Sequence, residues 1–328
     1  NYAQLVEAFI RNDLTGFKRL YLKDREIKNL ILMGDFLTET IFREERQDNI
    51  ITRAEFEKRY ENTVYKTETS LSEEMDIDPE YAALIVPTMV ICKDFMDLFN
   101  AEALWMPGVS LLDGIAYDFG EKKNFIKSAH NFENDILVAA RNIAKRYSTG
   151  KDHIKGTTDL ALAIFDSMKK VHGMGDRERL LLQIAVQLHD CGKYISMGDV
   201  AECSYQIIMA TEIIGLSTEE RQIIANAVRY NTTEFVYYSE IAGEVGMDRS
   251  VYLLIAKLTA ILRIANAMDR SHYQKVKNMK AMLKDRTLLL TVDSEQDISL
   301  ELGLLMDKVE FFEEVFGIRL VFRRKRKV

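Results

Sequence analysis

Residues that interrupt helices are rare in this chain, which has three prolines and 16 glycines among 328 residues. Proline breaks a helix interior and glycine weakens it, so a chain poor in both favours long helices. Apolar residues make up 47% of the sequence, enough for a sizeable core. The length exceeds the roughly 100–200 residues of one domain. The sequence therefore predicts a mainly helical globular protein with about two or three domains.

Composition also excludes some classes of protein. A formal net charge of −7 argues against binding nucleic acid over the whole surface. Three widely spaced cysteines do not make a disulfide framework, which predicts a reducing, cytoplasmic location. No apolar run approaches the roughly 20 residues that span a bilayer. The first residues indicate an amphipathic helix rather than a signal peptide, so no membrane partner is expected.

Short apolar runs alternate with helical periodicity over residues 1–122. The runs at 28–34 and 101–106 end in glycine or Pro-Gly, as buried strands do. Helices are expected between them, including 38–45 and 78–99. Strands separated by helices predict part of an α/β layer.

The texture changes at residue 123, where long helical patterns follow one another up to residue 272. Leu181–Leu188 is almost entirely apolar, which predicts a central, buried helix. Residues 273–328 differ again and predict a small α/β cap. Its expected elements are a strand, a helix and a second strand, at 286–292, 300–316 and 318–322. The expected fold class is α+β, mainly α.

The sharpest chemical signal is the segment LQIAVQLHDCGK at residues 182–193. A buried helix ends there in His189 and Asp190, and Gly192 lets the backbone turn. Neighbouring side chains on a regular helix point about 100° apart. At a helix end both could reach one cation. An imidazole with a carboxylate suits Zn, Mn, Fe or Ni better than Ca.

Two further residues complete a metal-binding set. His153 lies near the start of one helical segment, and Asp269 ends another. Three helices would converge, as they do at metal sites in helical domains, and a bound metal would activate water for attack on a phosphoryl group. A buried histidine bonded to an aspartate is also a common packing device, so both interpretations stay open. The remaining histidines have no partner pattern and are expected at the surface: His130, His172 and His272.

These residues resemble the HD superfamily. The set just described lies at its H…HD…D positions, and Lys193 fits its frequent HDxGK extension. The flanking sequences resemble, more specifically, the helical domain of the Ppx/GppA exopolyphosphatase and guanosine-pentaphosphatase family. The stretches that carry this resemblance are DHIKGTTDLALAIFDSM, ECSYQIIMATEIIGLSTEERQIIANAVRYN and ILRIANAMDRSH.

The N-terminal part resembles the same family through MDIDPEYAALIVPTMVICKDFMDLFNAEALWMPGVSLLDGIAYDF. The resemblance implies a partial actin/hexokinase-like (RNase H-like) half-domain at 1–122, an HD-type helical domain at 123–272 and the cap at 273–328. Relatives hydrolyse terminal phosphoanhydride bonds with Mg and a water. The implied partners are polyphosphate or a guanosine polyphosphate nucleotide, and a second copy of the chain in a homodimer.

Two departures from the family concern phosphate chemistry. Residues 1–30 contain no match to its catalytic glutamate or its Gly-Ser phosphate loop. The chain is therefore expected to start midway through the phosphatase module, and no catalytic residue is assigned. Where a Gly-Gly-Thr phosphate loop is expected, the sequence has MGDF, in which Gly34 is kept but Asp35 would repel a phosphate. The candidate phosphate-binding residues are Gly34, Arg229, Arg263 and Arg270.

A third departure concerns the metal. Cys203 and Asn231 stand where many relatives have histidine, so at most one weakly held divalent ion, Mg or another, is expected. The four residues are expected to act mainly as a buried polar cluster. Three hypotheses follow: part of a phosphoanhydride hydrolase that is inactive alone, an HD-type metal-dependent phosphohydrolase, or a non-catalytic sensor of polyphosphate or nucleotide.

Overall fold

The computed structural model describes residues 2–22, 25–34, 36, 49–128, 130–241, 248–276 and 278–324. The chain divides into two compact units, Asn1–Ala129 and His130–Val328, hereafter the first and second unit. Within the described residues the chain is mainly helical and has two small mixed sheets, which confirms the α+β, mainly-α prediction. The domain boundaries expected after residues 122 and 272 stay predictions.

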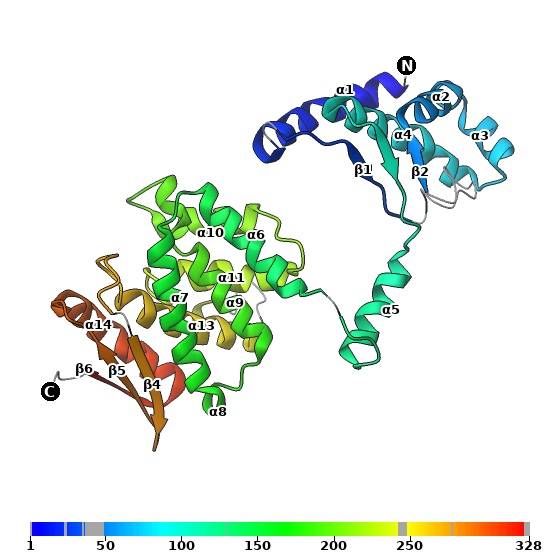
Figure 1. Cartoon of the computed structure of the whole chain (residues 1–328). Helices are drawn as coiled ribbons and strands as arrows, with labels where there is room; N and C mark the ends of the chain where they lie inside the picture. The colour runs from blue at the N-terminus through cyan, green and yellow to red at the C-terminus, as the bar shows by residue number, and fades with distance from the viewer. Residues whose placement is uncertain are drawn as a thin grey trace. The chain divides into compact units, whose positions relative to one another are not determined.

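The first unit packs helices against one small sheet (Figure 1). In this sheet β3 (Ala103–Trp105) is central, parallel to β1 (Asn29–Ile31) and antiparallel to β2 (Ile50–Thr52). The two predicted strands are therefore present in shorter form, whereas the helix expected at 38–45 lies outside the described residues. The helices are α1 (Tyr2–Phe17), α2 (Arg53–Thr63), α3 (Glu68–Met75), α4 (Pro79–Phe99) and α5 (Leu111–Lys122), with a π-helical turn at Lys18–Leu22.

The long helix α4 shows why this unit forms. It begins at Pro79, whose fixed φ suits the first helical position, and the Asp78 side chain accepts a hydrogen bond from the Glu80 backbone. It ends at Asn100 in a left-handed conformation. Its apolar face is buried in one core with Leu104 of β3. The helix predicted at 78–99 is confirmed.

The second unit is built around α9 (Asp176–Leu188). This helix contacts α6, α7, α11 and α13, and its apolar run is buried, which confirms the prediction of a central helix. The surrounding elements are α6 (Phe132–Arg146), α7 (Lys151–Ser167), α8 (Lys169–His172), the 3-10 turn η3 (Cys191–Tyr194), α10 (Val200–Ala210), α11 (Thr218–Arg229), α12 (Tyr238–Ile241) and α13 (Arg249–Ala267).

The C-terminal part of this unit is a three-stranded sheet with one helix. The elements are β4 (Asn278–Lys284), β5 (Thr287–Asp293), α14 (Ser299–Phe316) and β6 (Arg319–Arg324). The central strand β5 is antiparallel to β4 and parallel to β6. The sequence predicted all of these except β4, which forms a hairpin through Asp285 and Arg286, both with positive φ. Sheet and helices share one hydrophobic core.

Helix α13 is long and apolar enough to cross a membrane, judged by length and composition alone. About 67% of the segment that meets this test is buried inside the unit. Its neighbours are α7, α9, α11 and α14. Its apolar character is therefore accounted for by its place in the core.

Candidate metal centre

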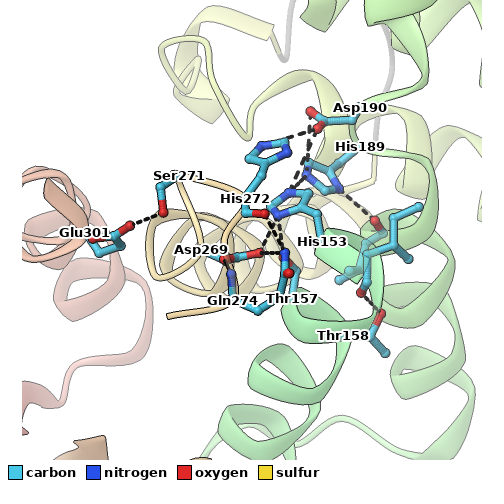
Figure 2. Close-up of polar contacts among 12 residues, drawn as sticks. His153, Thr157, Thr158, His189, Asp190, Asp269, Ser271, His272, Gln274 and Glu301 are labelled. Carbon is cyan, nitrogen blue, oxygen red and sulfur yellow. Dashed lines mark hydrogen bonds and ion pairs between the residues drawn. The ribbon is translucent and has the colours of Figure 1, made fainter. Parts of the chain in front are cut away.

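The structure brings together all four residues of the predicted metal set (Figure 2). His153 lies in the first turn of α7, and His189 caps the end of α9. Asp190 follows at the turn into η3, and Asp269 comes just after α13. Three helices that are separate in sequence therefore meet at their ends, as the order of the motifs predicted.

The turn that follows α9 is fixed by a close contact with α10. The backbone N–H of Gly192 donates to Ser204 Oγ at 2.8 Å, and this hydroxyl donates to the His189 carbonyl oxygen at 3.4 Å. A Cβ on Gly192 would lie 2.3 Å from the Val200 carbonyl oxygen. Only glycine fits there, which explains the glycine after the His-Asp pair. Ser204, which the sequence analysis missed, anchors the turn.

The two buried histidines face each other through their Nε2 atoms, which lie 3.1 Å apart. His153 Nδ1 is 2.7 Å from Asp269 Oδ2, and His189 Nδ1 is 2.7 Å from the Val186 carbonyl oxygen. A carboxylate and a carbonyl only accept hydrogen bonds, so both Nδ1 atoms carry hydrogen. In neutral rings each Nε2 then presents a lone pair to the other. A proton or a cation between them satisfies both.

Asp190 adds a carboxylate to this point. Its Oδ1 lies 3.6 Å from His189 Nε2, and its Oδ2 lies 3.9 Å from His153 Nε2. Ligand bonds of 2.0–2.2 Å in a tetrahedral site place neighbouring donor atoms about 3.3–3.6 Å apart, close to these separations. Lys193 Nζ donates to Asp190 Oδ2 at 2.5 Å.

The charges at this point follow from burial and from close partners. Burial lowers the pKa of His189, which keeps its ring neutral. Burial opposes ionisation of Asp190, but the hydrogen bond and the positive charge of Lys193 hold the pKa of its carboxyl below the usual value. The centre therefore combines a neutral imidazole with a carboxylate, the forms in which both side chains bind metals.

Asp269 lies on the other side of His153. Its Oδ2 accepts from His153 Nδ1, and its Oδ1 accepts from the Gln274 backbone N–H at 2.7 Å. The Gln274 side-chain amide also reaches Oδ2, at 3.2 Å. Asp269 was predicted as a ligand, but its carboxylate contacts His153 Nδ1, away from the facing Nε2 atoms. It orients the His153 ring, as a carboxylate behind a metal-binding histidine does.

A fifth residue, His272, joins the centre. Its ring stacks on that of His153, with centroids 3.6 Å apart and planes 6° apart, and its Nε2 lies 3.9 Å from Asp190 Oδ2. Burial first, and then the charges of His153 and Lys193, lower its pKa to about 4. His272 is exposed, as predicted, but the expectation that it has no partners is wrong. Its position three residues after Asp269 was the signal that could have revealed it.

The other two histidines differ from each other. His172 is buried, against the prediction, and its Nε2 donates to the Phe165 carbonyl oxygen at 2.9 Å. His130 is exposed as predicted, beside Asp135.

The predicted phosphate-binding residues occupy different surroundings. Arg263 is buried and donates to two backbone carbonyls, those of Tyr230 and Thr233. Arg229 pairs with Glu202 at 3.0 Å. Arg270 is exposed directly after Asp269. In the first unit, Gly34 has a φ of +140° after β1, and Asp35 lies outside the described residues.

A mainly helical unit with a buried histidine–aspartate centre at converging helix ends is the arrangement that the sequence motifs predicted. The sequence model of the Ppx/GppA phosphatase family, domain III, matches residues 138–310. The match spans more than half of the chain and includes the whole centre. The chain belongs to the Ppx/GppA phosphatase family. No curated protein matches the chain significantly.

Proposed function

We propose that this chain is part of a phosphoanhydride hydrolase that acts on polyphosphate or on guanosine polyphosphate nucleotides. The observation that carries the proposal is the domain III match over residues 138–310. The resemblance of the sequence before residue 122 to the end of the family's phosphatase module supports it. Both substrates are polyanions, so the protein must supply positive charge and backbone N–H groups around their phosphates.

Hydrolysis of a phosphoanhydride also needs an oriented water. Residues 1–30 have no match to the family's catalytic glutamate or Gly-Ser loop, so we assign no catalytic residue and propose that the chain is inactive alone. Gly34, Arg229 and Arg270 are the proposed phosphate contacts. Arg263 is the candidate least able to bind phosphate, because its guanidinium already donates to two backbone carbonyl oxygens inside the fold.

A second function, an HD-type metal centre, is favoured by the facing Nε2 atoms. His153, His189 and Asp190 would hold one divalent cation, Mg or another, with Asp269 and the Val186 carbonyl fixing the two rings. The residues fit such an ion because both histidines direct their Nε2 atoms to one point beside a carboxylate. When bound, the cation would offset phosphate charge or lower the pKa of a water.

The number of ions is limited by two replacements. Asn231 is buried after α11, and Cys203 lies on α10 next to Ser204. Neither offers the imidazole that a second ion would use, so one ion is proposed. A polar cluster without an ion would instead favour the third hypothesis, a non-catalytic sensor of polyphosphate or nucleotide.

Two measurements on the purified chain test these proposals. The first is phosphate release from polyphosphate with Mg, expected below about 0.1 s⁻¹, well under the usual 1–10³ s⁻¹ of enzymes. Faster release that copurifies with the chain would overturn the proposed inactivity. The second is metal content after dialysis against Zn, Mn or Mg, expected at one ion per chain. His153→Ala and Asp190→Asn should lose this ion, and the exposed control His130→Ala should keep it. Metal-free wild-type protein would overturn the metal centre.

A further inference from the structure

The histidines and the aspartate of the candidate centre differ in their exposure to solvent. His153 and His189 are buried, and Asp190 is nearly so. The side chain of His272 is 37% exposed, and its ring lies over His153. Among His153, His189, Asp190 and His272, His272 is therefore the most exposed to solvent.

The backbone holds His272 in an unusual conformation. Its φ of +59° lies in the left-handed region, which side chains rarely adopt. Its N–H donates to the Asp269 carbonyl oxygen at 2.9 Å, and its own carbonyl accepts from Gln274 Nε2 at 2.8 Å. Strained residues of this kind persist when their surroundings impose them, and they gather at functional sites.

A buried acid on α14 anchors the same loop. Glu301 accepts from Ser271 Oγ at 2.5 Å and from Lys275 Nζ at 3.3 Å. Ser271, before His272, is therefore bonded to Glu301, and Gln274, after it, is bonded to Asp269. These bonds hold the loop so that the His272 imidazole lies against His153 and is partly exposed to solvent.

We propose that His272 is the fourth, solvent-facing ligand of the cation held by His153, His189 and Asp190. This inference rests on the metal centre of the proposed function. A ring nitrogen of His153, a carboxylate oxygen of Asp190 and a ring nitrogen of His272 lie within 4.8 Å of one another, a spacing that a metal ion could bridge. Coordination requires the His272 ring to rotate, because parallel stacked rings direct their nitrogen lone pairs side by side.

Only His272 is free to make that movement. The other two rings are fixed through Nδ1 by Asp269 and by the Val186 carbonyl oxygen. The exposed side of the His272 ring leaves room for rotation. The ion would then enter from solvent and be closed in by His272.

This ligand set selects among metals. Three imidazoles and one carboxylate suit Zn²⁺, Co²⁺ or Ni²⁺, whereas Mg²⁺ prefers oxygen ligands in a near-octahedral arrangement. The chain should therefore bind Zn²⁺ and Co²⁺ far more tightly than Mg²⁺. If His153, His189 and Asp190 were the only ligands, the preference for Zn²⁺ and Co²⁺ over Mg²⁺ would be weaker, because one imidazole fewer would bind the ion.

The test is a titration of the full chain with Co²⁺, followed by visible absorption and calorimetry, with Zn²⁺ and Mg²⁺ as competitors. His272→Ala removes the ligand and the stacked ring, whereas His272→Phe keeps an aromatic ring over His153 without a nitrogen donor. His130→Ala is the exposed control. We expect both His272 variants to bind Co²⁺ at least about 10-fold more weakly than wild type, a loss of the size seen when metal-site partners are removed. The absorption of four-coordinate Co²⁺ should weaken with them, and the control should match wild type.

Two outcomes would overturn the proposal, and they differ from each other. In the first outcome, wild type binds one Co²⁺ and His272→Phe binds it equally well with the same spectrum. The His272 ring would then only cover the site, and the metal centre would consist of His153, His189 and Asp190 without His272. If wild type binds no Co²⁺ or Zn²⁺, the metal centre itself falls. Thermal unfolding of each metal-free variant shows whether a loss of Co²⁺ affinity comes from misfolding. If His272→Ala is misfolded, the Co²⁺ affinity of His272→Phe, which keeps an aromatic ring, decides the result.

Discussion

The two units use their sheets differently. In the second unit the inward side chains of β5, Leu288, Leu290 and Val292, are fully buried in the core that also contains α9 and α13. In the first unit Ile31, Trp105 and Ile50 form a row across the sheet, since strand register pairs Trp105 with both isoleucines. These three side chains are 57%, 43% and 40% exposed. Each sheet buries one apolar face, which in the first unit includes Ile51 and Leu104, but the sheet of the first unit also exposes an apolar row on its other face.

This difference bears on where chemistry can be built. A site that gathers four polar side chains from different helices needs helix ends held by packing on several sides. The second unit supplies that frame, with α7, α9 and α13 meeting around one core. In the first unit the strands are three residues long, and Gly34 follows one of them. The first unit therefore offers a candidate loop, and the second a formed centre.

The largest effect is expected where the frame of the second unit is tightest. Gly192→Ala places a Cβ 2.3 Å from the Val200 carbonyl oxygen and 2.6 Å from Ser204 Oγ. Backbone must move, so the free energy of unfolding should fall by about 3 kcal/mol or more. Gly303→Ala in α14 and Gly114→Ala in α5 are matched controls, because a Cβ there meets nothing within 4 Å. Both controls should raise stability by about 0.5–1 kcal/mol in denaturant titrations. Equal stability of all three variants would show that α10 does not constrain the turn.

The second effect separates the units by their response to metal. A Zn²⁺ concentration about 100 times the dissociation constant should stabilise the second unit by about 2.7 kcal/mol. For a unit of this size that is a rise of roughly 5–10 °C in its unfolding temperature. The first unit should not respond, and EDTA should reverse the shift in calorimetry. A melting profile that neither Zn²⁺ nor EDTA changes would instead support a buried polar cluster.

Sequence alone gave the frame of the second unit. The apolar run before His189 identified α9 as central, and the order His153, His189-Asp190, Asp269 placed three helix ends together. Both predictions were possible because buried helices and helix ends have recognisable residue patterns in the sequence. The strand β4 escaped notice because its Met-Lys-Ala-Met-Leu-Lys stretch lacks the β-branched residues that mark strands.

The details of the centre could not be predicted in the same way. Asp269 contacts His153 through Nδ1, and this depends on side-chain rotamers and on the loop that follows. His272 reaches the site with a positive φ, and the presence of a histidine in the sequence does not predict that backbone conformation. Arg263 looked like a phosphate contact but is buried over the Phe311 ring, 4.4 Å from its centroid. Each of these facts depends on tertiary packing rather than on local pattern.

A smaller effect is expected from acid on the buried His172 of the second unit. Its Nε2 donates to the Phe165 carbonyl oxygen, and its Nδ1 accepts from the Met174 N–H at 2.9 Å. Burial lowers its pKa, so the unfolded chain takes up a proton below about pH 6.5 while the folded chain does not. Stability should therefore fall as pH drops from about 6.5 towards the folded pKa, by up to about 1.4 kcal/mol per pH unit for this residue.

His172→Gln removes that titration and should flatten the fall of unfolding free energy between about pH 6 and pH 5. His189 and His272, whose pKa values are also lowered, keep their share of the slope in both proteins. An unaltered slope in His172→Gln would mean that His172 is protonated in the folded chain as well.

The smallest effect concerns the open row on the first unit. Ile31→Ala shortens a side chain that is 57% exposed, and surface substitutions usually change stability by less than about 0.5 kcal/mol. The matched change Leu290→Ala, on the buried face of β5, should cost about 2–5 kcal/mol. Denaturant titrations of both variants measure the contrast. If Ile31→Ala cost more than about 1.5 kcal/mol, the row would have to be covered in solution, because only lost burial gives an effect of that size. The first sheet would then be covered on the face that carries this row as well as on the face that buries Ile51 and Leu104.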